Sequence, residues 1–135
     1  MKGYKVFKTN NNGELLSCFV AGKARVKYAK EKRSKAPAWL RQYNKHLTFF
    51  LTLQQALRFK AGYLELQSTQ IWRVRAHDII FGGFLPSKSN ISSLGKGVVQ
   101  ETSGRWPLGT KMARTIIPEE KIDRNEIRRL GLPKV

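Results

Sequence analysis

The sequence predicts an α+β domain in which one helix, at about residues 52–60, packs on a mostly antiparallel sheet and a short helix lies near the C-terminus. Two observations predict this class: several short runs alternate apolar and polar residues, and one segment combines a helix cap with apolar residues at helical spacing. A third observation narrows it. The chain shows no alternation of strands with helices and no phosphate-binding glycine motif, so a Rossmann or P-loop fold is unsupported.

Length and composition bound the domain organisation. Of 135 residues, 41% are hydrophobic, which is enough for one packed core. We expect a single α+β domain over residues 1–118 and a tail over 119–135 that carries the short helix. No apolar run approaches the roughly 18–20 residues that span a bilayer, and the N-terminus lacks the apolar stretch of a signal peptide. These features favour an intracellular, cytoplasmic protein without a membrane span.

The N-terminal segment predicts a β-hairpin. Tyr4 to Lys8 alternates apolar and polar residues as a strand does, and residues 14–20 are rich in strand formers. Asn and Gly in the connection 9–13 tolerate a positive φ, so the chain can turn there. Residues 23–28 alternate again and predict a further strand with cations along one side.

The clearest helix signal lies in the middle of the chain. Thr52-Leu53-Gln54-Gln55 fits a capping box, with Thr52 as N-cap and Gln55 three residues later. The apolar residues that precede it, 47–51, predict a buried strand. A basic loop ends at Pro37, and the spacing of apolar residues over 39–43 predicts a short helix after it.

Residues 70–80 predict a long strand with two different sides. Trp72, Val74 and Asp78 fall on one side, and Arg73 and Arg75 fall on the other, together with Ile71 and His77. The cations of this strand therefore form a second basic stripe, in addition to the basic segment nearer the N-terminus.

The C-terminal half predicts a long irregular stretch followed by a strand and a helix. Residues 82–109 are rich in Gly, Ser and Pro, with a small hairpin arm expected at Val98-Val99. A final strand is expected over 111–117, closed by Pro118. Asp123 fits the N-cap of a helix, because Glu126 follows it three residues later.

The net charge is the main functional signal. The chain carries 26 Lys and Arg against 9 Asp and Glu, a formal charge of +17, which attracts polyanions. Nucleic acid binding is favoured further because neutralised phosphates release their counterions. Residues 23–45 hold nine cations against Glu31 alone, a net charge of +8. We expect the excess cations of the chain to gather on one side of the protein, and this segment to be the contact surface for nucleic acid.

Cations and aromatic rings are interleaved in this segment, the combination with which proteins bind single-stranded nucleic acid. The expected phosphate-binding residues are Lys23, Arg25, Lys27, Lys30, Lys32, Arg33, Lys35, Arg41, Lys45, Arg73, Arg75 and Arg105. The expected stacking rings are Tyr28, Trp39, Tyr43 and Trp106. Two alternatives stay open: the rings belong to the core, and the arginine stripe is covered by acids of the tail, Glu119, Glu120 or Glu126.

Three stretches resemble a known group of proteins. They are Gly3-Tyr4-Lys5-Val6-Phe7-Lys8, Phe50-Leu51-Thr52-Leu53-Gln54-Gln55-Ala56 and Trp106-Pro107-Leu108-Gly109-Thr110-Lys111-Met112-Ala113. Through these three stretches the chain resembles a group of small uncharacterised phage and prokaryotic proteins. Those proteins have a Gly-Tyr-Lys-Val start, a Phe-x-Thr-Leu-x-x-Ala junction and a Pro-x-Gly-Thr turn. The resemblance supports the fold and a phage origin. It implies no activity and no catalytic residue.

The function that we expect is non-enzymatic, largely sequence-independent binding of nucleic acid, with RNA or single-stranded DNA slightly favoured over duplex. Two other functions are alternatives to it. One is a phage-type interaction module that docks on an acidic surface of a host enzyme. The other is a small metal-independent nuclease that uses His46 or His77. The single cysteine, Cys18, excludes an internal disulfide, and no ligand spacing indicates a metal site. We therefore expect no metal and no cofactor.

Overall fold

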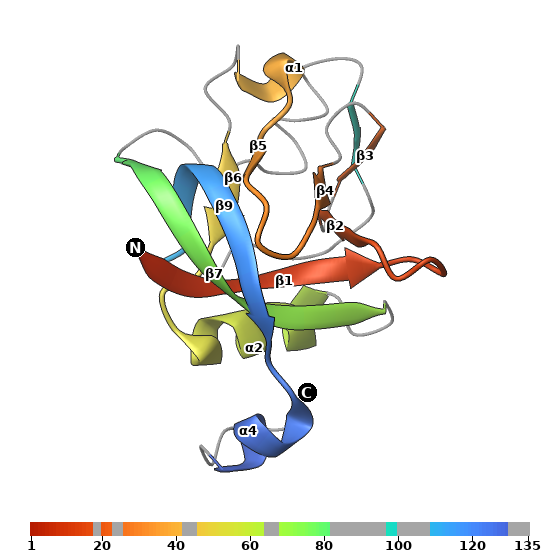
Figure 1. Ribbon diagram of the computed structural model, residues 1–135, viewed down its shortest axis with the longest axis vertical. Coiled ribbons are helices and arrows are strands. Elements are labelled where there is room, and N and C mark those ends of the chain that lie inside the picture. The colour runs from red at the N-terminus through yellow and green to blue at the C-terminus, as the bar shows by residue number, and fades with distance from the viewer. Residues whose placement is uncertain are drawn as a thin grey trace.

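The computed structural model describes residues 1–17, 20–22, 26–41, 46–63, 68–81, 97–99 and 109–129. Figure 1 shows the arrangement of the strands and helices within them. In chain order they are β1 (Lys2–Thr9), β2 (Leu15–Ser17), β3 (Val20–Gly22), β4 (Lys27–Tyr28), β5 (Ser34–Lys35), α1 (Ala38–Arg41), β6 (Leu47–Phe49), α2 (Leu53–Tyr63), β7 (Thr69–Ile80), β8 (Gly97–Val99), β9 (Lys111–Lys121) and α4 (Arg124–Arg129).

The main sheet is antiparallel and curls toward a barrel. Its strand order is β4-β2-β1-β7-β9-β5, and β6 is a further partner of β9. The residue that follows β6, Phe50, is bridged to β1, because Tyr4 and Phe50 exchange two backbone hydrogen bonds of 2.7 Å. In Figure 1, β7 and β9 run beside each other above α2 and cross β1. The predicted α+β class is confirmed, and a nearly closed barrel of β1, β7, β9 and β6 goes beyond it.

Barrel closure depends on a very close approach at Gly3. A Cβ atom at this position would lie 2.5 Å from the backbone oxygen of Phe50 and 2.7 Å from the ring of Phe49. Contacts this short do not occur, so only glycine lets β1 and the end of β6 meet here.

The predicted hairpin is confirmed between β1 and β2. Phe7 pairs with Ser17, and Thr9 pairs with Leu15. In the turn, the side-chain oxygen of Asn10 accepts hydrogen bonds of 3.0 Å from the N–H groups of Asn12 and Glu14. Asparagine closes turns in this way because its short side chain reaches its own backbone two to four residues on.

Helix α2 begins with the predicted capping box. The N–H of Gln55 donates to Oγ1 of Thr52 at 3.2 Å, and Oε1 of Gln55 accepts from the N–H of Thr52 at 3.2 Å. The helix continues to Tyr63, beyond the predicted end at residue 60. Its apolar stripe is buried and consists of Leu53, Ala56, Leu57 and Phe59.

The core fills the space between the barrel strands and α2. Its largest fully buried side chains are Phe7, Phe49, Phe59, Ile116, Val74 and Pro118. One cation lies inside as well, since Lys5 is only 6% exposed and its Nζ donates to the carbonyl of Thr48 at 2.5 Å. At least one of the cations that make up the net charge is therefore buried and does not contribute a contact at the surface.

Strand β9 does not end at Pro118, which corrects the expected strand of 111–117. Pro118 pairs with Val74, and the strand continues to Lys121. The register between β7 and β9 shifts between Arg73 and Val74. Proline donates no backbone hydrogen bond, and it is tolerated in a strand at such an irregularity. The continuous strand also crosses the expected boundary between domain and tail at residue 118, and Ile122 packs in the core at 5% exposure.

The alternation of β7 differs from the prediction at two positions. Ile71 is buried at 4% exposure, although strict alternation places it on the side of the arginines. Asp78 is exposed, although alternation places it with the buried Val74 and Ala76. The φ angle of Asp78 is +57°, and this left-handed conformation breaks the alternation locally, while the strand continues in the same register to Ile80. An aspartate adopts it at lower cost than most residues.

The C-terminal helix α4 begins where the sequence predicts. The N–H of Glu126 donates to Oδ1 of Asp123 at 2.8 Å, which is the expected cap. Ile127 packs against the core, so α4 is tied to the body of the protein. Val98-Val99 do lie in a strand, β8, but its antiparallel partner is the distant β3, with Val20 opposite Val99, instead of a neighbouring arm of a local hairpin.

Candidate nucleic-acid interface

Six of the expected phosphate-binding residues lie on described segments outside β7 and are exposed: Lys27, Lys30, Lys32, Arg33, Lys35 and Arg41. Lys23, Arg25, Lys45, Arg105, Tyr43 and Trp106 lie outside the described residues, and of Trp39 only the backbone position in α1 is described.

Three of these six cations, Lys30, Lys32 and Arg33, lie on one loop. We call residues 29–33, between β4 and β5, the basic loop. Its tip is fixed on β9, because the N–H of Glu31 donates to the carbonyl of Pro118 at 2.7 Å. A turn inside the loop is closed by a hydrogen bond of 3.1 Å from the N–H of Lys32 to the carbonyl of Ala29. Glu31 has a φ of +61°, so the chain reverses sharply at this point.

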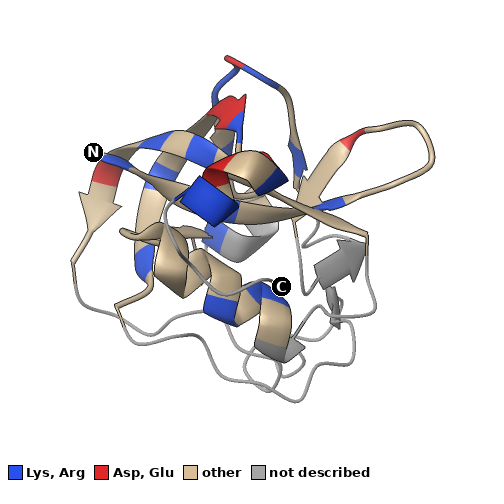
Figure 2. Ribbon diagram, turned by 90° about the horizontal axis from the view of Figure 1, so that it is seen from below, with Lys and Arg blue, Asp and Glu red and all other residues tan. Residues whose placement is uncertain are grey.

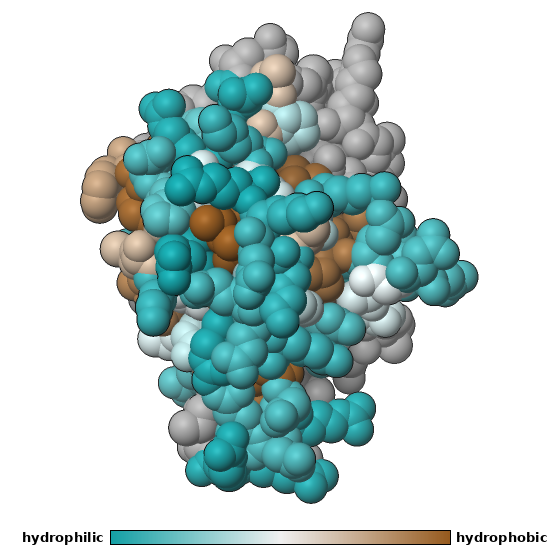
Figure 3. Space-filling view, viewed as in Figure 1, coloured by the Kyte–Doolittle hydropathy of each residue, from teal (hydrophilic) through white to brown (hydrophobic). Residues whose placement is uncertain are grey.

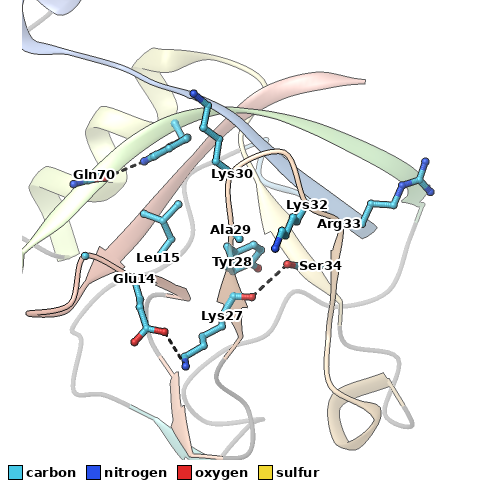
Figure 4. A pocket seen from close by; sticks show the side chains of 12 residues that line it. Glu14, Leu15, Lys27, Tyr28, Ala29, Lys30, Lys32, Arg33, Ser34 and Gln70 are labelled. Atoms are coloured by element: carbon cyan, nitrogen blue, oxygen red, sulfur yellow. Dashed lines mark hydrogen bonds and ion pairs between the residues drawn. The ribbon is translucent and has the colours of Figure 1, made fainter.

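The side chains of Lys30, Lys32 and Arg33 form no hydrogen bond or ion pair within the described part of the chain. Figure 4 shows Lys30 and Arg33 pointing to opposite sides of the loop, with Lys32 between them. Lys27, by contrast, pairs with Glu14 at 2.8 Å. The loop therefore presents its own three cations to solvent, available for an anion.

A cavity of about 550 Å³ lies on one side of the basic loop, and we call it the Trp72 cavity. Its lining includes Glu14, Lys27, Tyr28, Lys30, Lys32, Arg33, Gln70 and Trp72. Trp72 is half-buried, and its indole N–H donates to Oε1 of Gln70 at 3.0 Å. Strand alternation predicts Trp72 on the same side as the core residue Val74, so sequence reasoning misses this aromatic ring at the interface.

Tyr28 is a core residue, which corrects its assignment as a stacking ring. It is 5% exposed, and its ring packs edge-on against Phe7 with centroids 4.8 Å apart. A buried ring offers no face to a nucleobase. The alternative interpretation of the aromatic residues, that they belong to the core, is thus correct for Tyr28.

A second cavity, of about 240 Å³, lies on the other side, and we call it the His46 pocket. Its cations are Arg33, Lys35, Arg41 and Arg114, and its other lining residues are His46, Asp78 and Thr115. Arg33 lines both cavities, so the basic loop connects them. Burial lowers the pKa of His46 below its ordinary value, and the charges of Arg114 and Arg41 lower it further. These effects favour the neutral imidazole.

The arginine stripe of β7 is covered by acids, as the alternative expectation held. Arg73 pairs with Glu120 at 3.4 Å and also with Glu126 of α4. Arg75 pairs with Glu119 at 2.9 Å. These cations are largely neutralised by the chain itself, so the centre of the interface is the basic loop.

The described cations are not gathered on one side, which corrects that expectation. In Figure 2, Lys and Arg lie on α2 and α4 as well as on the strands. The view in Figure 3 is hydrophilic over most of the described surface. Where α2 approaches β9 and α4, burial lowers the pKa of Lys60, and the charges of Arg124 and Lys121 lower it further. What distinguishes the basic loop is its two adjoining cavities.

A scan against protein-family models finds no match, and searches of curated proteins and of solved structures find none either. Among the described residues, no helix is long and apolar enough to cross a membrane. The same residues contain no group of three or more His, Cys, Asp or Glu that could hold a metal ion. A function for this chain must therefore be inferred from the geometry of the basic loop and its cavities.

Proposed function

We propose that this chain is a non-enzymatic protein that binds nucleic acid through the basic loop, largely independently of sequence. The observation that supports the proposal most is the set Lys30, Lys32 and Arg33, exposed and unpaired within the described residues, with the Trp72 cavity on one side and the His46 pocket on the other. An extended polyanion can follow this path, because Arg33 belongs to both cavities. A cytoplasmic location and a phage origin belong to the same proposal.

The form of the site favours single strands over duplex. Lysines contact phosphates as point charges and carry little base specificity. A half-buried tryptophan beside such cations can stack one unpaired base. Among the described helices, α1 spans four residues and α4 six, while α2 buries its apolar stripe on the barrel, so none resembles a recognition helix that enters a major groove.

Binding of the unmodified protein to a labelled single-stranded 20-mer tests the proposal. With four to six phosphate contacts, log K should fall with log salt at a slope of roughly −3 to −4, or about 10²-fold between 50 and 200 mM. Affinity that is absent at 50 mM, or that does not change with salt, would refute it. Stoichiometric recovery of one protein from a nuclease-treated lysate, with no oligonucleotide binding, would instead support the interaction module.

Replacing Trp72 with leucine is expected to weaken single-strand binding by about 5- to 10-fold, since a stacked base contributes about 1–3 kcal/mol and this ring is only partly exposed. The slope of affinity against salt should not change, because no cation is removed. Fluorescence anisotropy with oligonucleotides measures both quantities. A duplex of the same sequence serves as the control, since its bases are not free to stack. Equal losses for single strand and duplex would contradict a stacking role.

A further inference from the structure

The His46 pocket is assembled from five separate segments. Lys35 comes from β5, Arg41 from α1, Asp78 from β7 and Arg114 from β9, while His46 immediately precedes β6. At about 240 Å³, the pocket has less than half the volume of the Trp72 cavity, which holds about 550 Å³. Two of its lining residues are buried, His46 at 8% and Thr115 at 3% exposure, so they form the floor below an exposed cationic rim.

The strand register explains why these residues meet. In the β7–β9 ladder, His77 pairs with Thr115 and Ile79 pairs with Ala113, so Asp78 stands opposite Arg114. In the β6–β9 ladder, Leu47 pairs with Ala113, which places His46 beside Arg114 on the other side. Arg114 therefore lies in the middle of a row formed by three strands. The φ of +57° turns Asp78 to the surface at the same point.

The charge of the pocket calls for a divalent anion. Four cations face one carboxylate, Asp78, so the permanently charged side chains of the lining carry a net charge of +3. Within the described residues, Arg33, Lys35, Arg41, Arg114 and Asp78 form no ion pair. Like charges held this close repel one another unless an anion lies between them.

Size and charge together identify the class of anion. A volume of about 240 Å³ corresponds to roughly eight water molecules at about 30 Å³ each, enough for a phosphate group with several hydrating waters. A phosphodiester inside a strand carries one negative charge, whereas a phosphate monoester carries close to two at pH 7, because its second pKa is about 6. A pocket with a closed floor also admits the end of a strand more readily than its middle.

We propose that the His46 pocket binds a phosphate monoester dianion through Arg33, Lys35, Arg41 and Arg114. Within the proposed function, on which this step rests, the dianion is the terminal phosphate of a nucleic acid strand whose internal phosphates contact the basic loop. The exposed side chain of Asp78 lowers the positive charge of the rim and limits the affinity for anions.

Oligonucleotides that differ only at their ends test this inference. One single-stranded 20-mer is prepared with a 5′-phosphate, with a 3′-phosphate and with hydroxyl groups at both ends. We expect a phosphorylated end to raise affinity by roughly tenfold, the scale of one additional hydrogen bond to a charged group. Arg114→Gln should reduce this ratio to about two, and Arg41→Gln should do the same. Arg58→Gln on α2 removes the same charge outside the pocket and should leave the ratio unchanged.

Asp78→Asn provides a test in the opposite direction. Asparagine adopts a positive φ as readily as aspartate, so the fold should not change. The loss of one negative charge from the lining should raise the preference for a phosphorylated end by about 2- to 5-fold. A preference that falls or stays constant would contradict the assigned role of Asp78.

A titration with inorganic phosphate tests anion binding in the His46 pocket independently of oligonucleotide binding. In an NMR titration, a bound dianion should raise the pKa of the His46 imidazole, since it favours the protonated ring. If all three 20-mers bind with equal affinity and that binding is strong and salt-dependent, this inference is overturned and the proposed function stands. If no oligonucleotide binds while inorganic phosphate still shifts the His46 resonance, the proposed function is overturned, and the pocket is a site for free phosphate.

Discussion

Replacing Lys30, Lys32 and Arg33 together with glutamine is expected to lower affinity for a single-stranded 20-mer by roughly 10²-fold at 50 mM salt. Each phosphate contact contributes about −0.7 to the slope of log K against log salt, so the loss of three contacts should reduce the slope by about 2. The fold should be unaffected, because these side chains are exposed and unpaired within the described residues. Anisotropy titrations at several salt concentrations measure both effects.

A matched variant distinguishes a site from general attraction by net charge. Arg58, Arg128 and Arg129 are exposed on α2 and α4, away from both cavities, and their replacement with glutamine removes the same total charge. This control should keep the affinity within about threefold of the original protein, since long-range attraction is screened beyond a Debye length of about 10 Å at 0.1 M salt. Equal losses in the two triple variants would mean that the basic loop is not the interface.

Three features that the sequence predicts correctly are closed by short-range hydrogen bonds. The turn at Asn10 and the caps at Thr52 and Asp123 each join residues two to four positions apart. A short window of sequence predicts such contacts, because only a few backbone dihedral angles separate the donor from the acceptor. The segment of basic residues is also visible locally, and part of it does form the exposed basic loop.

Features that depend on strand pairing are not visible in this way. Closure of the barrel joins Tyr4 to Phe50, and Arg73 meets Glu126 across 53 positions of the sequence. The His46 pocket requires three strands in one register, so Arg114 gives no local sign of its role. The left-handed conformation at Asp78 breaks the alternation that predicts its burial. Sequence pattern alone assigns neither the partner of a strand nor its irregularities.

The described parts of the three stretches that support the resemblance to the phage and prokaryotic group come together in the structure. Gly3 in the first contacts Phe50 in the second. A Cβ atom on Gly109 in the third would collide with the side-chain amide of Gln55, and Gly109 has a φ of +90°. Their convergence, at the junction between β6 and α2, indicates a structural role for these residues. The membership itself stays a prediction.

Replacing Gly3 with alanine should therefore destabilise the protein strongly. The new methyl group would lie 2.5 Å from the carbonyl oxygen of Phe50, a backbone atom that cannot rotate away. One strand must shift, which breaks or lengthens the two hydrogen bonds between Tyr4 and Phe50. We expect a loss of about 3 kcal/mol in the free energy of unfolding. For a chain of this length, this corresponds to a decrease of roughly 10–15 °C in Tm.

Gly13→Ala serves as the control that separates the effect of the steric clash at Gly3 from the general cost of replacing a glycine. Gly13 lies in the hairpin turn with a φ of +74° and has no atom within 4 Å of the position that a methyl group would take, so alanine there costs only the unfavourable conformation, about 1 kcal/mol. Thermal unfolding should place Gly13→Ala well above Gly3→Ala. Hydrogen exchange adds a local readout, because the amides of Tyr4 and Phe50 should exchange faster in Gly3→Ala alone. Equal decreases in Tm, with both amides still protected, would show that the barrel does not depend on the contact at Gly3.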